Sequence, residues 1–167
     1  MLPICERPHH LTDLVLDYVT NFKWISSSLK GSHTPFISGV IEILKNSADS
    51  HIEYLIQYPP DIKIYTLDIG KLDLYAVSNN GREKIALEYD SKWHLRYKSI
   101  LKLLLSDADT CFAVYGGVEE PSSRNIMFYY DNLRRINFMR KKFHLYDLGK
   151  SLHIVNLTKK KSKLIYL

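Results

Sequence analysis

Three acidic residues, Asp73, Glu88 and Asp90, have the type and spacing needed for metal-assisted chemistry. They lie in a segment from Lys71 to Asp90 in which apolar and polar residues alternate on both sides of Asn80-Gly81, the favoured central pair of a two-residue β-hairpin turn. With this pair as the loop, the numbers of facing residues add up to 161, so Asp73 faces Glu88. Their β-carbons are then about 4.5–5.5 Å apart, and Asp90 lies one pleat further along the same face.

The three carboxylates predict a divalent cation at this face of the hairpin. Like charges placed directly opposite each other are destabilising by up to about 1 kcal/mol, and by more where the face is covered. Mg²⁺ and Mn²⁺ compensate such charge, because they bind one or two carboxylates together with water and substrate phosphate oxygens. Either ion can activate water and stabilise the leaving group in phosphodiester cleavage. Asp73, Glu88 and Asp90 are therefore predicted as metal ligands and catalytic residues, with Mg²⁺ or Mn²⁺ as the cofactor.

The same pattern has a simpler interpretation, in which this face of the hairpin is solvated. The acids are then polar positions that pair with Lys71, Arg82 or Lys84. The register also depends on the turn, because a loop of three or four residues that includes Asn79 would shift the partner of Asp73. A slip of one residue would break the facing of the two carboxylates.

The segments before the hairpin predict helices followed by a strand. Apolar spacing indicates a helix over about residues 10–23. A second helix has Pro35 in its first turn and ends before Pro59-Pro60, since proline interrupts helical hydrogen bonding. Alternation over Ile62–Thr66 predicts a half-buried strand.

The segments after the hairpin predict a helix at Lys92–Leu105 and a buried strand at Thr110–Tyr115. Residues 124–143 favour a helix, although Ile126, Phe128 and Tyr130 also alternate as in a strand. Leu152–Leu157 is a last strand before a lysine tail. The order ααβββαβαβ predicts one α/β domain over residues 1–167, with a central mixed sheet flanked by helices.

Composition indicates a folded chain whose net positive charge comes from its C-terminal part. Of 167 residues, 46% are hydrophobic and 25% are charged, with seven Gly and six Pro, which excludes a disordered or collagen-like protein. The net charge is +5, but residues 1–131 carry 13 Lys and Arg against 17 Asp and Glu, whereas residues 132–167 carry ten against one.

Two basic runs flank the last predicted strand and favour a surface that binds a polyanion; the alternative is solvated charge without a partner. The second run continues to Lys163. The predicted nucleic-acid-binding residues are Arg134, Arg135, Arg140, Lys141, Lys142, Lys159, Lys160 and Lys161.

The acidic hairpin with the helix and strand that follow it resembles the PD-(D/E)xK nuclease superfamily, which has the restriction-endonuclease-like, or archaeal resolvase-like, fold. The resemblance is carried by the stretch from Gly70 to Gly117 and extends over residues 42–117. It implies an αβββαβ core over about residues 36–117, with an extra N-terminal helix and a C-terminal helix and strand in the basic part at 132–167. In that family an Asp and a following acid bind Mg²⁺ and a lysine orients or deprotonates the attacking water. Asp73 takes the place of the motif Asp, and Glu88 takes that of the motif (D/E).

The motif lysine is displaced in this chain. Asp90 occupies the position where the family has lysine, and Leu72 stands at the motif proline. Some branches of the superfamily carry the lysine on the following helix, where Lys98 is the first choice here, Lys102 the second and Lys92 the third. Asp90 then becomes an extra metal ligand.

A helical glutamate joins the site in some members of the family. Glu53 and Glu42 are the candidates here, with a plain surface position as the alternative for each. The loss of the strand lysine also fits a degenerate relative that no longer cleaves.

We therefore expect a Mg²⁺-dependent endonuclease that hydrolyses DNA, with Lys98 near the scissile phosphate and the basic residues binding phosphates without reading bases. The alternative is a catalytically inactive relative that binds nucleic acid or acts in assembly. Tyr129 and Tyr130 either stack on bases or pack against the sheet.

The remaining features bear on partners and location. Residues 1–10 lack the apolar centre of a signal peptide and no apolar run is long enough to cross a membrane, so we expect a soluble, intracellular, cytoplasmic protein without a membrane partner. Cys5 and Cys111 show no CxxC spacing, and nothing requires a disulfide between them. The apolar face of the helix at 10–23 either completes the core or forms a homodimer interface.

Overall fold

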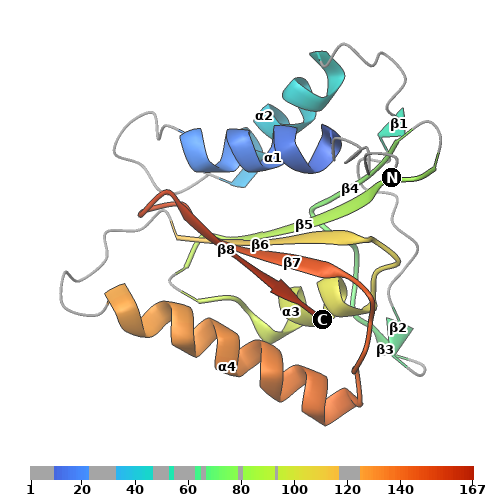
Figure 1. The fold of residues 1–167 in the computed structure, drawn as a ribbon, viewed down its shortest axis with the longest axis vertical. Helices are drawn as coiled ribbons and strands as arrows, with labels where there is room; N and C mark the ends of the chain where they lie inside the picture. The colour runs from blue at the N-terminus through green and yellow to red at the C-terminus, as the bar shows by residue number, and fades with distance from the viewer. Residues whose placement is uncertain are drawn as a thin grey trace, which may run out of the picture.

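The computed structural model consists of a mixed β-sheet with helices on both faces (Figure 1). The residues that it describes are 10–22, 33–46, 53–54, 63–64, 67–78, 81–92, 94–116 and 125–167. Within these residues the main sheet has six strands in the order β1-β4-β5-β6-β7-β8. The strands are β1 Glu53–Tyr54, β4 Leu74–Val77, β5 Lys84–Asp90, β6 Thr110–Tyr115, β7 Ser151–Asn156 and β8 Lys161–Tyr166. The central strands β5, β6 and β7 are parallel, and β1, β4 and β8 pair antiparallel with their neighbours.

The helices lie in two layers, one on each face of the sheet (Figure 1). One layer holds α1 His10–Asn21 and α2 His33–Asn46, and the other holds α3 Tyr97–Leu105 and α4 Asn125–Phe143. Successive strand residues point to opposite faces, so Leu87 packs in the core beneath α1 and α2, while Ala86 packs in the core beneath α3 and α4. The predicted α/β class with a mixed sheet and flanking helices is confirmed.

The predicted register of the β4–β5 hairpin is confirmed. Leu74 pairs with Leu87 and Val77 with Lys84, so the numbers of every facing pair add up to 161. The hairpin loop is nevertheless wider than two residues: the Ser78 nitrogen donates to the Glu83 oxygen at 2.9 Å, and the Gly81 nitrogen donates to the Ser78 oxygen at 2.7 Å. The loop gains one residue on each side, so the register is unchanged. Residues 79–80, on which the predicted turn type depends, lie outside the described part of the chain.

The helix α3 connects the parallel strands β5 and β6. The predicted strand at Thr110–Tyr115 is confirmed as β6, and all six of its residues are buried, as expected for a strand covered on both faces. The predicted helix at Lys92–Leu105 starts later than expected, because Arg96 has extended backbone angles and caps a helix that begins at Tyr97.

The second predicted helix is too long. Its Pro35 does lie in the first turn of α2, but the helix ends at Asn46, and Glu53–Tyr54 forms the strand β1 that pairs with β4. Apolar residues near 52–55 fit a helical period as well as a strand, and pairing with the open edge of β4 satisfies backbone groups there. The strand expected at Ile62–Thr66 appears as β2 Lys63–Ile64, which pairs with β3 Leu67–Asp68 in a separate two-stranded sheet.

The C-terminal part contains one strand more than predicted. Residues 125–143 are helical, as the longer apolar pattern favoured, and the predicted last strand is β7. The expected lysine tail is instead the turn and first half of β8, which pairs with β7 from Asn156–Lys161 to Ser151–Tyr166. Its lysines alternate with Ser162 and Leu164, as in a strand with only one covered face. The strand was not predicted from the sequence because its lysines were interpreted as a solvated tail.

The helix α1 completes the core, because Leu11, Val15 and Val19 are buried against α2 and the sheet. Beneath α3, the free thiol of Cys111 is buried, with its Sγ 3.5 Å from the Leu103 oxygen and 3.7 Å from the Ser106 Oγ. Cys5 lies outside the described residues. Among the helices that the structure describes, none is both long and apolar enough to cross a membrane.

Candidate active site

The backbone of the β4–β5 hairpin brings Asp73 and Glu88 together. Asp73 directly precedes β4 and donates its backbone N–H to the Glu88 Oε1 at 3.0 Å. In return, the Asp73 Oδ2 accepts a hydrogen bond from the backbone N–H of Tyr89 at 2.8 Å. The predicted register thus brings the two residues together. The predicted sharing of one face is not what the structure has, because the Asp73 carboxylate contacts His33 of α2 and the Glu88 carboxylate contacts Lys102 of α3, on the other side of the sheet (Figure 1).

Lys102 is the lysine that reaches this acidic pair. It lies on α3, and its Nζ is 2.5 Å from the Glu88 Oε1 and 2.5 Å from the Lys71 backbone oxygen. Its side chain is only 9% exposed and that of Glu88 is 0% exposed, so the pair forms a buried ion pair. Lys102 was the second choice from the sequence, and the structure puts its ammonium group on the predicted motif acid.

The two oxygens of Glu88 have different surroundings. Oε1 receives both the Asp73 nitrogen and Lys102, whereas Oε2 is buried and has no hydrogen-bond partner among the described residues. Burial, followed by repulsion from Asp73, raises the pKa of Glu88 to about 7, although Lys102 opposes this shift. Near neutral pH this site therefore holds a carboxylate that one ammonium group does not fully stabilise.

Asp73 borders an open cavity. Its side chain is 16% exposed, and its Oδ2 lies 3.1 Å from the His33 Nε2 at the start of α2. The His33 ring stacks on the Tyr89 ring with centroids 5.8 Å apart. A cavity of about 440 Å³ between α2 and the segment at 71–73 is lined by His33, Ser38 and Asp73, among other residues. Asp73 is therefore the carboxylate of this pair that borders open space.

Asp90 belongs to a different ion pair. Its side chain is 1% exposed, its Oδ2 accepts the Arg96 backbone N–H at 2.8 Å, and its Oδ1 contacts the Arg96 Nε. Both of its oxygens are engaged by Arg96, so the extra metal-ligand role predicted for Asp90 would require this pair to open.

The other predicted lysines and glutamates are distributed over α2, β1, α3 and the segment that follows β5. Lys98 is exposed on α3, with its Nζ 3.6 Å from the position that a Cβ on Gly70 would occupy. Lys92 is exposed, and Glu42 is exposed on α2. Glu53 is in a strand, so the helical position proposed for it is wrong.

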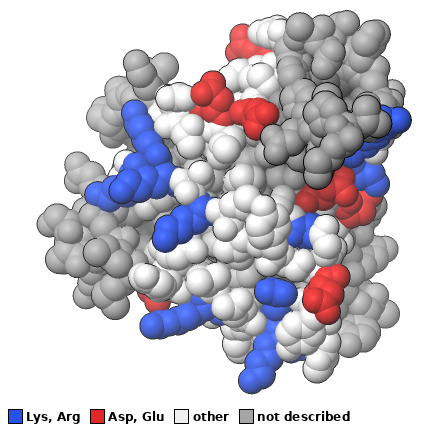
Figure 2. All heavy atoms as spheres, in the orientation of Figure 1, with Lys and Arg blue, Asp and Glu red and all other residues white. Residues whose placement is uncertain are grey.

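The predicted nucleic-acid-binding residues are divided between α4 and the β7–β8 hairpin (Figure 2). On α4, Arg134 is exposed beside Asp131 at 3.4 Å, and Lys141 is exposed. The other three contact neighbouring groups: Arg135 lies over the Tyr97 ring, Arg140 donates to the Leu145 oxygen, and Lys142 lies over the Phe138 and Phe143 rings. Lys159, Lys160 and Lys161 form the turn of the hairpin and the start of β8.

Sequence reasoning missed two residues of this site, His33 and Arg96. Nothing in the spacing of His33 connects it with Asp73, because that contact depends on how α2 packs over the sheet. The contact of Arg96 with Asp90 could have been suspected, since Arg96 lies six residues after Asp90, near the start of the predicted helix. In the described part of the chain, no group of three or more His, Cys, Asp or Glu is arranged to hold a metal ion by itself.

Comparisons with protein-family models, with curated proteins and with solved structures give no match for this chain. Its function therefore has to be inferred from the arrangement of its own residues.

Proposed function

We propose that this protein is a metal-dependent nuclease that hydrolyses DNA phosphodiester bonds. The observation that carries the proposal is the shared oxygen of Glu88, which accepts both the Asp73 backbone nitrogen and the Lys102 ammonium group. Glu88 thus contacts Lys102 directly and Asp73 through its backbone, and carboxylates with a nearby lysine are groups that metal-assisted phosphodiester hydrolysis uses.

The arrangement of the elements supports a restriction-endonuclease-like core. The antiparallel hairpin β4–β5 is followed by α3 and by β6, which is parallel to β5, and α2 covers the opposite face. The main sheet and its helices follow in the order α2, β1, β4, β5, α3 and β6, with β2 and β3 inserted as a separate sheet. This order supports the αβββαβ succession implied by the resemblance to PD-(D/E)xK nucleases, with the acids on the hairpin and the lysine moved from the strand to the helix.

The residues present fit a Mg²⁺ or Mn²⁺ ion in donor type and in charge. Mg²⁺ takes one or two protein carboxylates and completes its coordination with water and phosphate oxygens, so Asp73 and Glu88 suffice. Asp73, Glu88 and Asp90 face two permanent cations, Lys102 and Arg96, which leaves one negative charge in this group when His33 is neutral. The negative charge is least stabilised at the Glu88 Oε2, because this buried oxygen has no hydrogen-bond partner among the described residues. When bound, the ion would activate water and stabilise the leaving oxygen.

The chain's own residues have separate roles in this proposal. Asp73 and Glu88 would hold the metal, and Lys102 would favour the charged form of Glu88 and carry a positive charge beside the reacting phosphate. His33 contacts Asp73 from the rim of the cavity and orients its carboxylate. The exposed basic residues of α4 and of the β7–β8 hairpin bind DNA phosphates by charge.

The test is cleavage of a panel of linear, branched and single-stranded DNA with Mg²⁺ and Mn²⁺. Glu88→Gln and Asp73→Asn should each lower cleavage by about a hundredfold or more, because each removes a metal ligand. DNA binding measured with EDTA should survive in both variants. Asp17→Asn, at an exposed aspartate of α1, is the matched control and should cleave normally. Cleavage that persists in both site variants would refute the assignment.

A specific observation also favours the inactive alternative. Each of the three carboxylates already contacts a basic side chain: Asp73 contacts His33, Glu88 contacts Lys102 and Asp90 contacts Arg96. A site neutralised in this way could hold the fold together in a protein that only binds nucleic acid. Salt-sensitive DNA binding without calorimetric Mn²⁺ uptake and without cleavage would establish this alternative, whereas Mn²⁺ uptake that Glu88→Gln removes would exclude it.

A further inference from the structure

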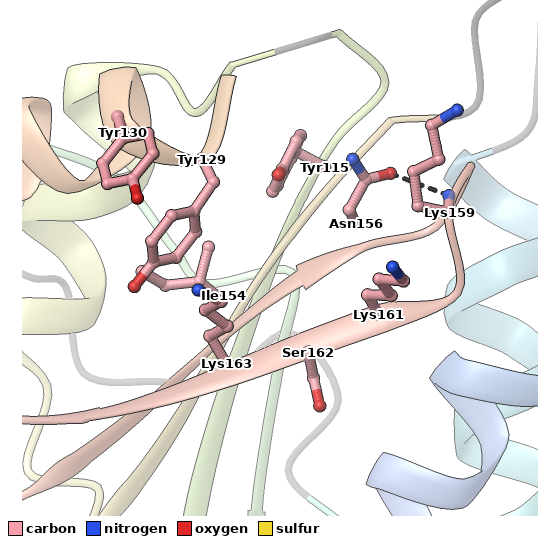
Figure 3. Close-up of a pocket in the computed structure, with 9 residues that line it drawn as sticks. All are labelled: Tyr115, Tyr129, Tyr130, Ile154, Asn156, Lys159, Lys161, Ser162 and Lys163. Carbon is pink, nitrogen blue, oxygen red and sulfur yellow. Dashed lines mark hydrogen bonds between the residues drawn. The ribbon is translucent and has the colours of Figure 1, made fainter. Parts of the chain in front are cut away.

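A second cavity, of about 430 Å³, lies between α4 and the β7–β8 hairpin (Figure 3). Its volume is within the range of small-molecule sites. Tyr115, Tyr129 and Tyr130 line it from the side of β6 and α4, and Lys159, Lys161 and Lys163 line it from the hairpin. No acidic residue is among the described residues that line it. The cavity therefore combines aromatic surface with positive charge.

The tyrosines offer a ring surface on which a planar group can stack. The Tyr130 side chain is 53% exposed, and its ring lies 5.5 Å from that of Tyr129 in an edge-to-face arrangement. The Tyr129 ring also carries Lys163, whose Nζ is 4.4 Å from the ring centroid. The Lys163 contact holds Tyr129 in place, so Tyr130 is left as the ring that a ligand can reach.

The lysines are held by a defined turn. The Asn156 Oδ1 accepts the backbone N–H of Lys159 at 3.0 Å, as drawn in Figure 3, and Lys160 takes a left-handed conformation with a φ of 50°. Lys161 then begins β8 opposite Asn156. The ammonium groups at this mouth thus come from an ordered hairpin, which suits the binding of a phosphate group.

The cavity shares a face of the sheet with Glu88 and Asp90. Asp90 pairs with Tyr115, Tyr115 with Asn156, and Asn156 with Lys161, so one row of residues crosses four strands. Neighbouring strands lie about 4.8 Å apart, which puts Lys161 about 14 Å from Asp90 along this row. The next row connects Glu88 with Lys163 in the same way, through Ala113 and Ile154. Asp90, Tyr115 and Asn156 are buried, and the open cavity beside Asp73 lies against α2 on the other face of the sheet (Figure 1), so the two cavities are separate sites.

We propose that this cavity binds one unpaired nucleotide of a single-stranded nucleic acid, with its base on Tyr130 and its phosphate on Lys161 and Lys159. A base inside a duplex is stacked on both sides and cannot present a face to a side chain, so the site selects single-stranded segments. The inference rests on the proposed nuclease function only for the kind of substrate, which it narrows to nucleic acid with a single-stranded part.

The test is the affinity of labelled oligo(dT), oligo(rU) and a duplex of the same length, measured by fluorescence anisotropy with EDTA present. Tyr130→Ala should weaken single-strand binding about tenfold and leave duplex binding within about twofold. Tyr146→Ala is the matched control, because Tyr146 has nearly the same exposure, 52%, and lies outside the cavity. Tyr130→Trp should restore the affinity, since it keeps a stacking ring. Lys161→Gln should lower the salt dependence of the binding constant by about one released counterion, and Lys161→Arg should keep the salt dependence of the unaltered protein.

Equal losses in Tyr130→Ala and Tyr146→Ala would overturn the proposal, as would equal losses for duplex and single strand or failure of the unaltered protein to bind either oligonucleotide. Oligo(dT) and oligo(rU) arms distinguish DNA from RNA as the source of the nucleotide. The assay needs no metal, so selective loss in Tyr130→Ala supports the cavity even if no cleavage occurs. If the unaltered protein cleaves DNA and the Tyr130→Ala variant still binds single strands normally, the proposal for the cavity is refuted and the proposed nuclease function is not.

Discussion

Glu88 and Asp90 lie two residues apart on the same face of β5, and both side chains are almost fully buried, yet their surroundings differ. Arg96 engages both oxygens of Asp90 through its backbone nitrogen and its guanidinium group. Lys102 engages one oxygen of Glu88 and leaves the other without a partner, and the pKa of Glu88 is raised to about 7 because burial and then Asp73 disfavour its charge. The geometry of the partner, rather than burial alone, thus decides which carboxylate keeps an oxygen without a hydrogen bond among the described residues.

The largest expected effect comes from removing Lys102, the cation that contacts Glu88. Lys102→Met keeps the size of the side chain but leaves a buried carboxylate unpaired, so the free energy of unfolding should fall by about 4 kcal/mol at pH 8.5. The loss should shrink at pH 5, where Glu88 is protonated in both proteins. Urea unfolding at the two pH values measures it.

Lys98→Met is the control for this variant, because Lys98 lies one turn earlier on the same helix and is exposed. It should change the free energy of unfolding by less than about 0.5 kcal/mol. A similar loss in the two variants would contradict the buried pairing of Lys102.

The pH dependence of stability should separate Glu88 from the other acids. Its pKa is raised from 4.5 to about 7 in the folded protein, so the folded state binds more protons than the unfolded state between these values. The contribution of Glu88 is therefore fully present below pH 4.5 and is lost as the pH rises through 7, a fall of about 3 kcal/mol. Glu88→Gln should abolish this fall in denaturation curves recorded with EDTA.

Glu42→Gln provides the comparison and should keep the fall, since this glutamate is exposed on α2. Adding Mn²⁺ above pH 7 should recover part of the lost stability in the unaltered protein and none in Glu88→Gln. Parallel curves for the unaltered protein and Glu88→Gln would show that Glu88 does not titrate in this way.

The smallest expected effect concerns the partner of Asp90. Arg96→Met removes the guanidinium group but leaves the backbone hydrogen bond of residue 96 to Asp90, and water can reach this side chain, which is 59% exposed. The free energy of unfolding should fall by about 1–2 kcal/mol at pH 8, less than in Lys102→Met, because solvent replaces part of the lost contact. A loss larger than that of Lys102→Met would reverse the comparison between the two acids.

The pairing of Asp73 with Glu88 could be predicted from the sequence because a hairpin is a local structure. Alternation fixes which residues share a face, and the widened loop kept the register since it gained one residue on each side. The buried strand β6 was also predictable, because six consecutive apolar or small residues between polar ends fit a strand covered on both faces.

The choice between Lys98 and Lys102 could not be made from periodicity. Both lie on one flank of α3, one turn or about 6 Å apart along the axis, and the height of α3 over the sheet decides which of them meets Glu88. One local signal did favour Lys102, which sits between Leu101 and Leu103 in a run of buried residues, whereas Lys98 follows the exposed Tyr97.

The contact of His33 with Asp73 joins residues 40 positions apart in the chain and depends on packing alone. The strand β8 was hidden for another reason. Its lysines are also typical of a solvated tail, and its pairing with β7, which joins it to the sheet, shows that it is a strand.

The reactivity of the Cys111 thiol can report how often α3 moves away from the acidic site. It lies under α3, within 3.5 Å of the Leu103 oxygen, and burial raises its pKa, so reagents can modify it only when the helix lifts from the sheet. The same movement would separate Lys102 from Glu88, since both contacts are made by this one helix. In a Cys5→Ser background, the alkylation rate of Cys111 therefore records how often the lysine leaves its carboxylate, without any substrate or metal being present.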